Sequence, residues 1–139
     1  MEEDARSADL GGGYDRVLVD APCSNLGTLA SRPDARWRKS PEAIASLAVL
    51  QSEILEHAAA CLRPGGTLVY ATCTISRREG EERVQALEAA RPDLSVEDLG
   101  ASHPGVASVR DPRFLQIRPD RDSTDGFFIS RLTAAGDGR

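Results

Sequence analysis

The chain has 139 residues, of which 40% are hydrophobic and 28% are charged, with a net charge of −5. These values suit one soluble globular domain. No apolar run reaches the roughly 20 residues that a membrane helix needs, and no basic-then-apolar leader suggests export. The three cysteines form an odd count without a common zinc spacing. We therefore expect free thiols, no metal site and a cytoplasmic protein.

The first part of the chain predicts a flexible lead-in, a buried strand and a long loop. Residues 1–13 are polar and end in three consecutive glycines, which predicts the flexible lead-in. The apolar residues within Tyr14–Asp20 predict a strand that stops before Pro22. Residues 23–39 show no helical periodicity, so we expect a loop there. The folded core is expected to span residues 14–135.

A long helix and a second buried strand are predicted next. Ser40 is a suitable N-cap, and Pro41 suits the first helical position. Apolar residues recur at spacings of three and four as far as Leu62, which predicts one buried helix face. The turn residues at 64–66 should then end this helix and start a strand at 67–71.

The C-terminal part predicts a second helix and shorter strands. Ser76 and Glu79 have the spacing of a capping box, which predicts a helix from there to Pro92. Later strands are predicted at Leu94–Leu99, at Phe127–Leu132 and, more weakly, around 114–117. Alternating strands and helices predict an α/β fold, as part of a doubly wound sheet.

Two cysteines follow the two buried strands. Cys23 lies in Asp20-Ala21-Pro22-Cys23-Ser24, and Cys73 lies in Ala71-Thr72-Cys73-Thr74. Open α/β sheets bind ligands at the carboxyl ends of their strands, so we expect both thiols at that edge. A thiolate is a soft, strong nucleophile, which suits an attack on an unreactive pyrimidine ring.

These two segments resemble the hallmarks of the RNA 5-methylcytosine methyltransferases of the Sun/Fmu (RsmB-like) family. The resemblance extends to Arg32–Trp37, Arg63–Tyr70 and Thr124–Phe128. It implies a Rossmann-like, S-adenosylmethionine-dependent methyltransferase fold. It also implies methyl transfer to carbon 5 of a cytosine in RNA, with ribosomal RNA as the expected partner.

The resemblance implies different roles for the two thiols. Cys73 would be the nucleophile that adds to the base, and Cys23 would assist breakdown of the covalent intermediate. A thiolate at Cys73 is also favoured if, as we expect, it lies just before a helix N-terminus. The Pro-Cys setting of Cys23 resembles the nucleophile of DNA cytosine methyltransferases, so the reverse assignment stays open. Cys61 lies on the apolar helix face and is predicted to be core.

By the same resemblance, Asp20 lines the cofactor site and faces the base, and Asp4 reaches the adenine. A strand-end cap is the alternative role for Asp20. The family's domain begins with three more strands and a glycine-rich turn, which nothing before Tyr14 matches. We therefore expect the carboxyl-terminal half of a catalytic domain, with weak cofactor binding by itself. Its exposed first strand predicts self-association.

One stretch beside the cysteine edge is locally basic. Arg32, Arg36, Arg38 and Lys39 could hold RNA phosphates, and an indole such as Trp37 can stack on an unpaired base. For the four cations the alternative is a solvated loop. For Trp37 we expect burial beneath the sheet instead of stacking.

The sequence departs from the family at several positions. Asn25 stands where glycine is usual, and Gly80 stands where the family often has a polar side chain. Asparagine tolerates the left-handed conformation well, so we expect the turn to survive. Two functional classes stay open, namely an RNA cytosine methyltransferase or its catalytic half, and a non-catalytic fragment or RNA-interaction module.

Overall fold

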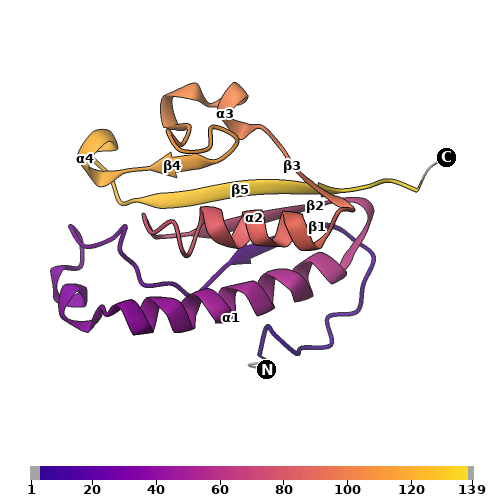
Figure 1. The fold of residues 1–139 in the computed structure, drawn as a ribbon, viewed down its shortest axis with the longest axis horizontal. Coiled ribbons are helices and arrows are strands. Elements are labelled where there is room, and N and C mark those ends of the chain that lie inside the picture. Colours follow the sequence, from indigo (N-terminus) through magenta and orange to yellow (C-terminus); the bar gives the residue numbers. More distant parts are fainter. Residues whose placement is uncertain (1–3, 138–139) are drawn as a thin grey trace.

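In the computed structural model, residues 4–137 are described, apart from the side chains of Ala35 and Arg38, and they form one five-stranded sheet (Figure 1). The strands are β1 (Tyr14–Asp20), β2 (Leu62–Thr72), β3 (Leu94–Val96), β4 (Leu115–Ile117) and β5 (Phe127–Ala134). Their order is β1-β2-β5-β3, with β4 also paired to β5. β1 and β2 are parallel, whereas β5 is antiparallel to its three partners. The predicted α/β fold is confirmed, as a mixed sheet.

Two helices, α1 (Pro41–Ala60) and α2 (Glu81–Ala90), lie side by side against one face of this sheet (Figure 1). The predicted start of α1 is confirmed, because the Ser40 hydroxyl accepts a hydrogen bond from the Ala43 amide at 3.1 Å. Shorter helical turns complete the chain: η1 (Pro33–Arg38), α3 (Leu99–Ser102), η2 (Pro104–Val106) and α4 (Pro119–Asp122).

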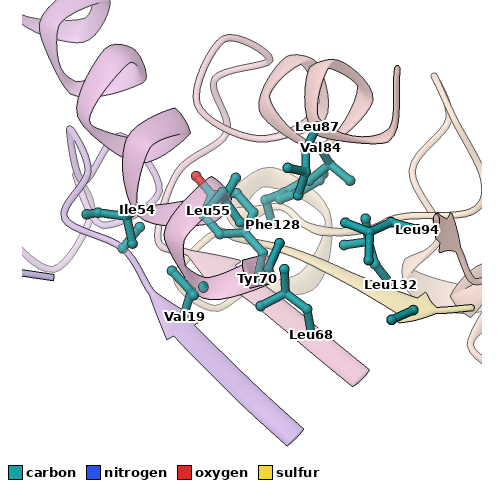
Figure 2. Packing of buried hydrophobic residues seen from close by; sticks show 14 of the residues in the cluster. Val19, Ile54, Leu55, Leu68, Tyr70, Val84, Leu87, Leu94, Phe128 and Leu132 are labelled. Atoms are coloured by element: carbon teal, nitrogen blue, oxygen red, sulfur yellow. The ribbon is translucent and has the colours of Figure 1, made fainter. Parts of the chain in front are cut away.

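The hydrophobic core fills the space between these helices and the sheet (Figure 2). Leu55 of α1, Val84 of α2, Tyr70 of β2 and Phe128 of β5 are almost completely buried. Each such side chain contributes about 1.5–3 kcal/mol when it leaves water. Cys61 is buried at the end of α1, which confirms its predicted place in the core.

The predicted capping box before α2 is wrong. α2 begins at Glu81, and its N-cap residue Gly80 has no side chain to cap the helix. A Cβ on Gly80 would lie only 2.8 Å from the Phe128 ring, so this contact requires glycine. The Glu79 carboxylate turns into the interior of the protein instead of bonding back to Ser76.

Three further boundaries differ from the sequence predictions. β2 begins at Leu62 instead of 67, because Tyr14 of β1 pairs with Leu62 before an irregularity in the register. The segment 23–39, predicted as a loop, contains the short helix η1. β3 ends at Val96 because Asp98 caps the next short helix by accepting from the Ala101 amide at 2.9 Å.

The face of the sheet opposite α1 and α2 is only partly covered by described residues. Side chains alternate between the two faces of a strand, so Leu18 and its neighbour Val69 on β2 point away from the helices. Leu18 is 70% exposed. β1 is also an edge strand, with one row of backbone groups unpaired within the sheet. An apolar edge of this kind is a template for pairing with another chain.

We expect the purified chain to self-associate through this edge. Leu18→Glu should shift sedimentation velocity profiles toward monomer, because a charge would then oppose burial of the β1 face. Val109→Glu is the matched control, since Val109 is also exposed (83%) but lies in the segment before β4. A monodisperse wild-type monomer at high concentration would contradict the expectation.

Candidate active site

The structure brings together the two cysteines that the sequence singled out. Cys23 lies three residues after β1, and Cys73 directly follows β2. β1 and β2 are parallel neighbours, and Asp20 lies opposite Ala71. The two strands therefore end at the same edge of the sheet, and the two cysteines lie there. The two Sγ atoms are 3.2 Å apart, and both residues are half-buried free thiols.

Asn25 lies against both sulfur atoms. Its backbone has φ +58°, so the left-handed turn expected at this position is confirmed. This conformation places the side-chain Oδ1 2.7 Å from the Sγ of Cys73, which donates to it, and 3.5 Å from the Sγ of Cys23. A glycine at this position would leave both thiols without this polar neighbour.

A buried carboxylate joins the two cysteine loops, defined here as residues 21–27 and 73–80. Glu79 is completely buried, and its oxygens accept from the Ser24 amide at 2.7 Å and the Ser24 hydroxyl at 2.6 Å. They also accept from the Thr74 hydroxyl at 2.9 Å and the Gln51 amide at 3.2 Å. The donors come from both cysteine loops and from α1. Glu79 therefore links these three segments through hydrogen bonds.

Sequence reasoning missed this role for Glu79. The residue has capping-box spacing, and no local pattern indicates that it points inward. Only the tertiary structure shows that Ser24 and Thr74, the residues that follow the two cysteines, meet at one carboxylate.

Two glycines set the distance between the first cysteine loop and the start of β5. The Gly27 amide donates to the carbonyl of Cys73 at 3.1 Å, and the Gly126 amide donates to the carbonyl of Gly27 at 2.7 Å. A Cβ on Gly27 would lie 2.1 Å from the Gly126 carbonyl oxygen, so no larger residue fits without movement. Nearby, Asp125 accepts from the Ser31 hydroxyl at 3.0 Å. The segment 124–128 therefore supports the cysteine edge.

The two thiols lie in an environment that disfavours charge on Cys23. Burial, opposed by a hydrogen bond from the Asn25 backbone, raises the pKa of Cys23 to about 12, and the nearby Cys73 and Glu79 add to this increase. Burial and Glu79 also raise the pKa of Tyr70, whose hydroxyl donates to the Glu79 carbonyl at 2.6 Å. Cys23 is therefore a neutral thiol, with a proton to donate, at physiological pH.

The expected helix N-terminus beside Cys73 is absent. The first helix after Cys73 is α2, which begins only at Glu81. A turn closed by the Glu79 and Gly80 amides, both donating to the Ser76 carbonyl, fills the gap. The positive end of a helix therefore does not explain a thiolate at Cys73 in this structure.

A groove of about 370 Å³ runs along the β1 edge next to the cysteines. Its lining includes Ala5, Tyr14, Asp20, Pro22 and His57, so it joins the N-terminal segment, β1 and α1. Asp20, at the end of β1, is exposed there.

Asp4 has a partner in its own segment. Its carboxylate forms an ion pair with Arg6 at 2.5 Å. The hydrogen bond from the Arg6 side chain lowers the pKa of Asp4 to about 2. Asp4 is therefore an ionised acceptor already engaged by a neighbour, close to Ala5 in the wall of the groove.

The basic stretch lies on η1 and its flanks. Arg32 and Arg36 are exposed and Lys39 is half-buried, while the side chain of Arg38 lies outside the described residues. The predicted burial of Trp37 is wrong, because the indole is 85% exposed. No described side chain covers it, since η1 projects from the loop between β1 and α1 (Figure 1).

A second groove, of about 500 Å³, begins at Ile75 in the second cysteine loop. Gln116 lines it and donates to the Thr74 carbonyl at 3.2 Å. Its arginines are paired with acids, as in the contact between Arg110 and Glu81 at 3.0 Å. This groove was not expected from the sequence.

Two kinds of site are not found in the described part of the chain. No group of three or more His, Cys, Asp or Glu residues there could hold a metal ion. No helix among those residues is both long and apolar enough to span a membrane.

Known proteins resemble this chain over most of its length. The family model described as 16S rRNA methyltransferase RsmB/F matches residues 1–133. The ribosomal RNA small subunit methyltransferase B of Vibrio vulnificus is 42% identical over 119 residues, which cover 86% of this chain and 26% of that protein.

Solved structures also resemble this chain over most of its length. The crystal structure of PH0851 superposes with a TM-score of 0.86 and 35% identity, covering 94% of this chain and 29% of the other. The crystal structure of NSun6 from Pyrococcus horikoshii with SFG gives a TM-score of 0.82 and 32% identity, covering 99% of this chain and 34% of the other.

The chain thus spans between 25% and 29% of the length of the curated relatives that it matches. The match nevertheless includes both cysteine loops, the strands that precede them and the segment that supports them. The chain belongs to the 16S rRNA methyltransferase RsmB/F family.

Proposed function

We propose that this chain is the cysteine-bearing part of an S-adenosylmethionine-dependent methyltransferase that modifies carbon 5 of a cytosine in ribosomal RNA. The observation that carries the proposal is the pair of thiols, 3.2 Å apart, at the carboxyl ends of two parallel strands. One thiol can form the covalent bond to the base, and the other can act as a proton donor or acceptor. The proposed reaction needs one nucleophile and one such acid–base group.

In the proposed reaction Cys73 is the nucleophile. Its thiolate adds to the ring carbon next to carbon 5, which raises the electron density at carbon 5. S-adenosylmethionine, when bound, would supply the electrophilic methyl group for carbon 5 and would leave as S-adenosylhomocysteine. The proton on carbon 5 would then pass to solvent, and the carbon–sulfur bond would break with its electron pair returning to Cys73, which restores the aromatic ring.

Cys23 is proposed to assist that last stage. Burial raises the pKa of Cys23 to about 12, so it is a poor nucleophile at neutral pH but retains a proton. Its Sγ lies 3.2 Å from that of Cys73, close enough to donate a proton to the Cys73 sulfur as the carbon–sulfur bond breaks. The raised pKa of Cys23 argues against Cys23 as the attacking group.

The cofactor is proposed to use the groove along β1. Asp20 in its lining could hydrogen-bond the base as charge develops, and Asp4 lies near the wall formed by Ala5. The groove is mostly apolar, which fits an adenine ring, and its carboxylate suits a positively charged sulfonium. Asp4 would have to release Arg6 to reach a ligand.

The proposed RNA contacts lie on η1. Arg32, Arg36, Arg38 and Lys39 supply cations for phosphates, and the exposed Trp37 can stack on a base. This surface is adjacent in sequence to the first cysteine loop, so bound RNA would pass the thiols.

We expect a chain completed with the segments that its longer relatives carry to transfer a labelled methyl group from S-adenosylmethionine to cytosine in small-subunit ribosomal RNA. Mass spectrometry of digested nucleosides should detect 5-methylcytidine, and calorimetry should show that the uncompleted chain binds the cofactor weakly. A completed protein that binds RNA without methylating it would favour a non-catalytic RNA-interaction module.

A further inference from the structure

One polar side chain contacts both thiols. The Oδ1 of Asn25 lies 2.7 Å from the Sγ of Cys73 and 3.5 Å from that of Cys23, and the two sulfurs are 3.2 Å apart. The left-handed backbone of Asn25, with φ +58°, directs its carboxamide toward them.

The observed contact suits the neutral thiol and not the thiolate. A carboxamide oxygen accepts the S–H proton of Cys73, but it would face the lone pairs of a deprotonated sulfur. Rotation of the terminal amide by half a turn exchanges the oxygen for an NH₂ group of nearly the same size. Two N–H donors would then face the two sulfurs from the position that the oxygen now occupies.

Apart from the Cys23 thiol, which can donate to the Cys73 sulfur across 3.2 Å, the groups near the pair are engaged elsewhere. The Glu79 carboxylate accepts from the Ser24 hydroxyl, and the Tyr70 hydroxyl donates to the Glu79 carbonyl. Arg83, a cation close to Tyr70, donates to the Ser52 hydroxyl and the Arg78 carbonyl. The helix N-terminus that could have supplied positive charge is absent at Cys73. The Asn25 carboxamide, 2.7 Å from the Cys73 sulfur, is therefore the side-chain amide placed to donate to it after rotation.

We propose that Asn25 is a catalytic residue whose side-chain amide, after it rotates, donates hydrogen bonds to the Cys73 thiolate. Its meaning for methyl transfer rests on the proposed function, whereas its effect on the thiol does not. A hydrogen bond to a charged group contributes about 1.5–3 kcal/mol, so losing it should reduce thiolate reactivity by roughly ten-fold or more.

The test is the pH profile of iodoacetamide alkylation at each cysteine of the purified chain. Asn25→Gly removes the amide and keeps a residue that accepts φ +58°. Its alkylation profile at Cys73 should move to higher pH by about one unit, with a roughly ten-fold slower rate at pH 7.5. Asn25→Asp should move it further, because a carboxylate would face the thiolate. Tandem mass spectrometry assigns each adduct, since Cys61 and Cys73 share a tryptic peptide.

Ser123→Gly is the matched control. Ser123 has φ +54°, lies after α4 and does not contact the thiols, so its profile should equal that of the wild type. An Asn25→Gly profile that stays in place, or moves to lower pH, would overturn the proposal, as would a shift seen at Cys23 instead of Cys73. The assay needs neither cofactor nor RNA. A missing methyltransferase activity would therefore overturn the proposed function without touching this result.

Discussion

Replacing Cys73 by serine in the completed enzyme should abolish methyl transfer to RNA. A serine hydroxyl is neutral near pH 7 and cannot add to the cytosine ring, so the covalent step is lost altogether. The variant should keep its fold, because oxygen for sulfur is a small change at a half-buried site. Incorporation of label from S-adenosylmethionine into RNA measures the loss, which we expect to exceed a thousand-fold.

Replacing Cys23 by serine should have a different result in the same assay. Addition and methylation should proceed, because Cys73 and its contact with Asn25 remain. Release should stall, because a serine hydroxyl is a weaker acid than a thiol and gives its proton less readily to the departing Cys73 sulfur. Protein–RNA adducts should therefore accumulate and appear as a slow band on a denaturing gel.

Cys61→Ser is the control for general effects of thiol loss. Cys61 is buried at the end of α1, away from the pair, so this variant should lower stability without trapping RNA. If Cys23→Ser formed no adduct while Cys73→Ser trapped RNA, the two roles would be reversed.

Replacing Glu79 by alanine should destabilise the fold by about 3 kcal/mol. The change leaves the Ser24 amide and the hydroxyls of Ser24 and Thr74 buried without their acceptor. Glu79→Gln should cost less, because one amide oxygen can still accept. Urea unfolding followed by circular dichroism measures both free energies, and the melting temperature of the alanine variant should fall by roughly 10 °C.

Glu82→Ala is the matched control on the neighbouring helix turn. The Glu82 side chain is 41% exposed and lies 3.9 Å from Arg83, so its loss should change stability by less than about 0.5 kcal/mol. An alanine variant of Glu79 that unfolds like the wild type would show that the cysteine loops do not depend on this carboxylate.

The sequence by itself determined the features that depend on local patterns. The strand at Tyr14–Asp20 and the start of α1 at Pro41 follow from apolar runs and from capping chemistry, which act within a few residues. The juxtaposition of Cys23 and Cys73 followed as well, because each lies at or just past the carboxyl end of a strand, and parallel neighbours end at one edge.

Only the tertiary structure decided which way the remaining side chains point. Glu79 carries a capping signal, yet its carboxylate turns inward because four donors from three segments converge on it. Trp37 is apolar enough to be core, yet it is exposed because η1 projects from the sheet. Asn25 meets both thiols only after β1 and β2 have paired. These contacts join residues far apart in the chain, so no local periodicity could reveal them.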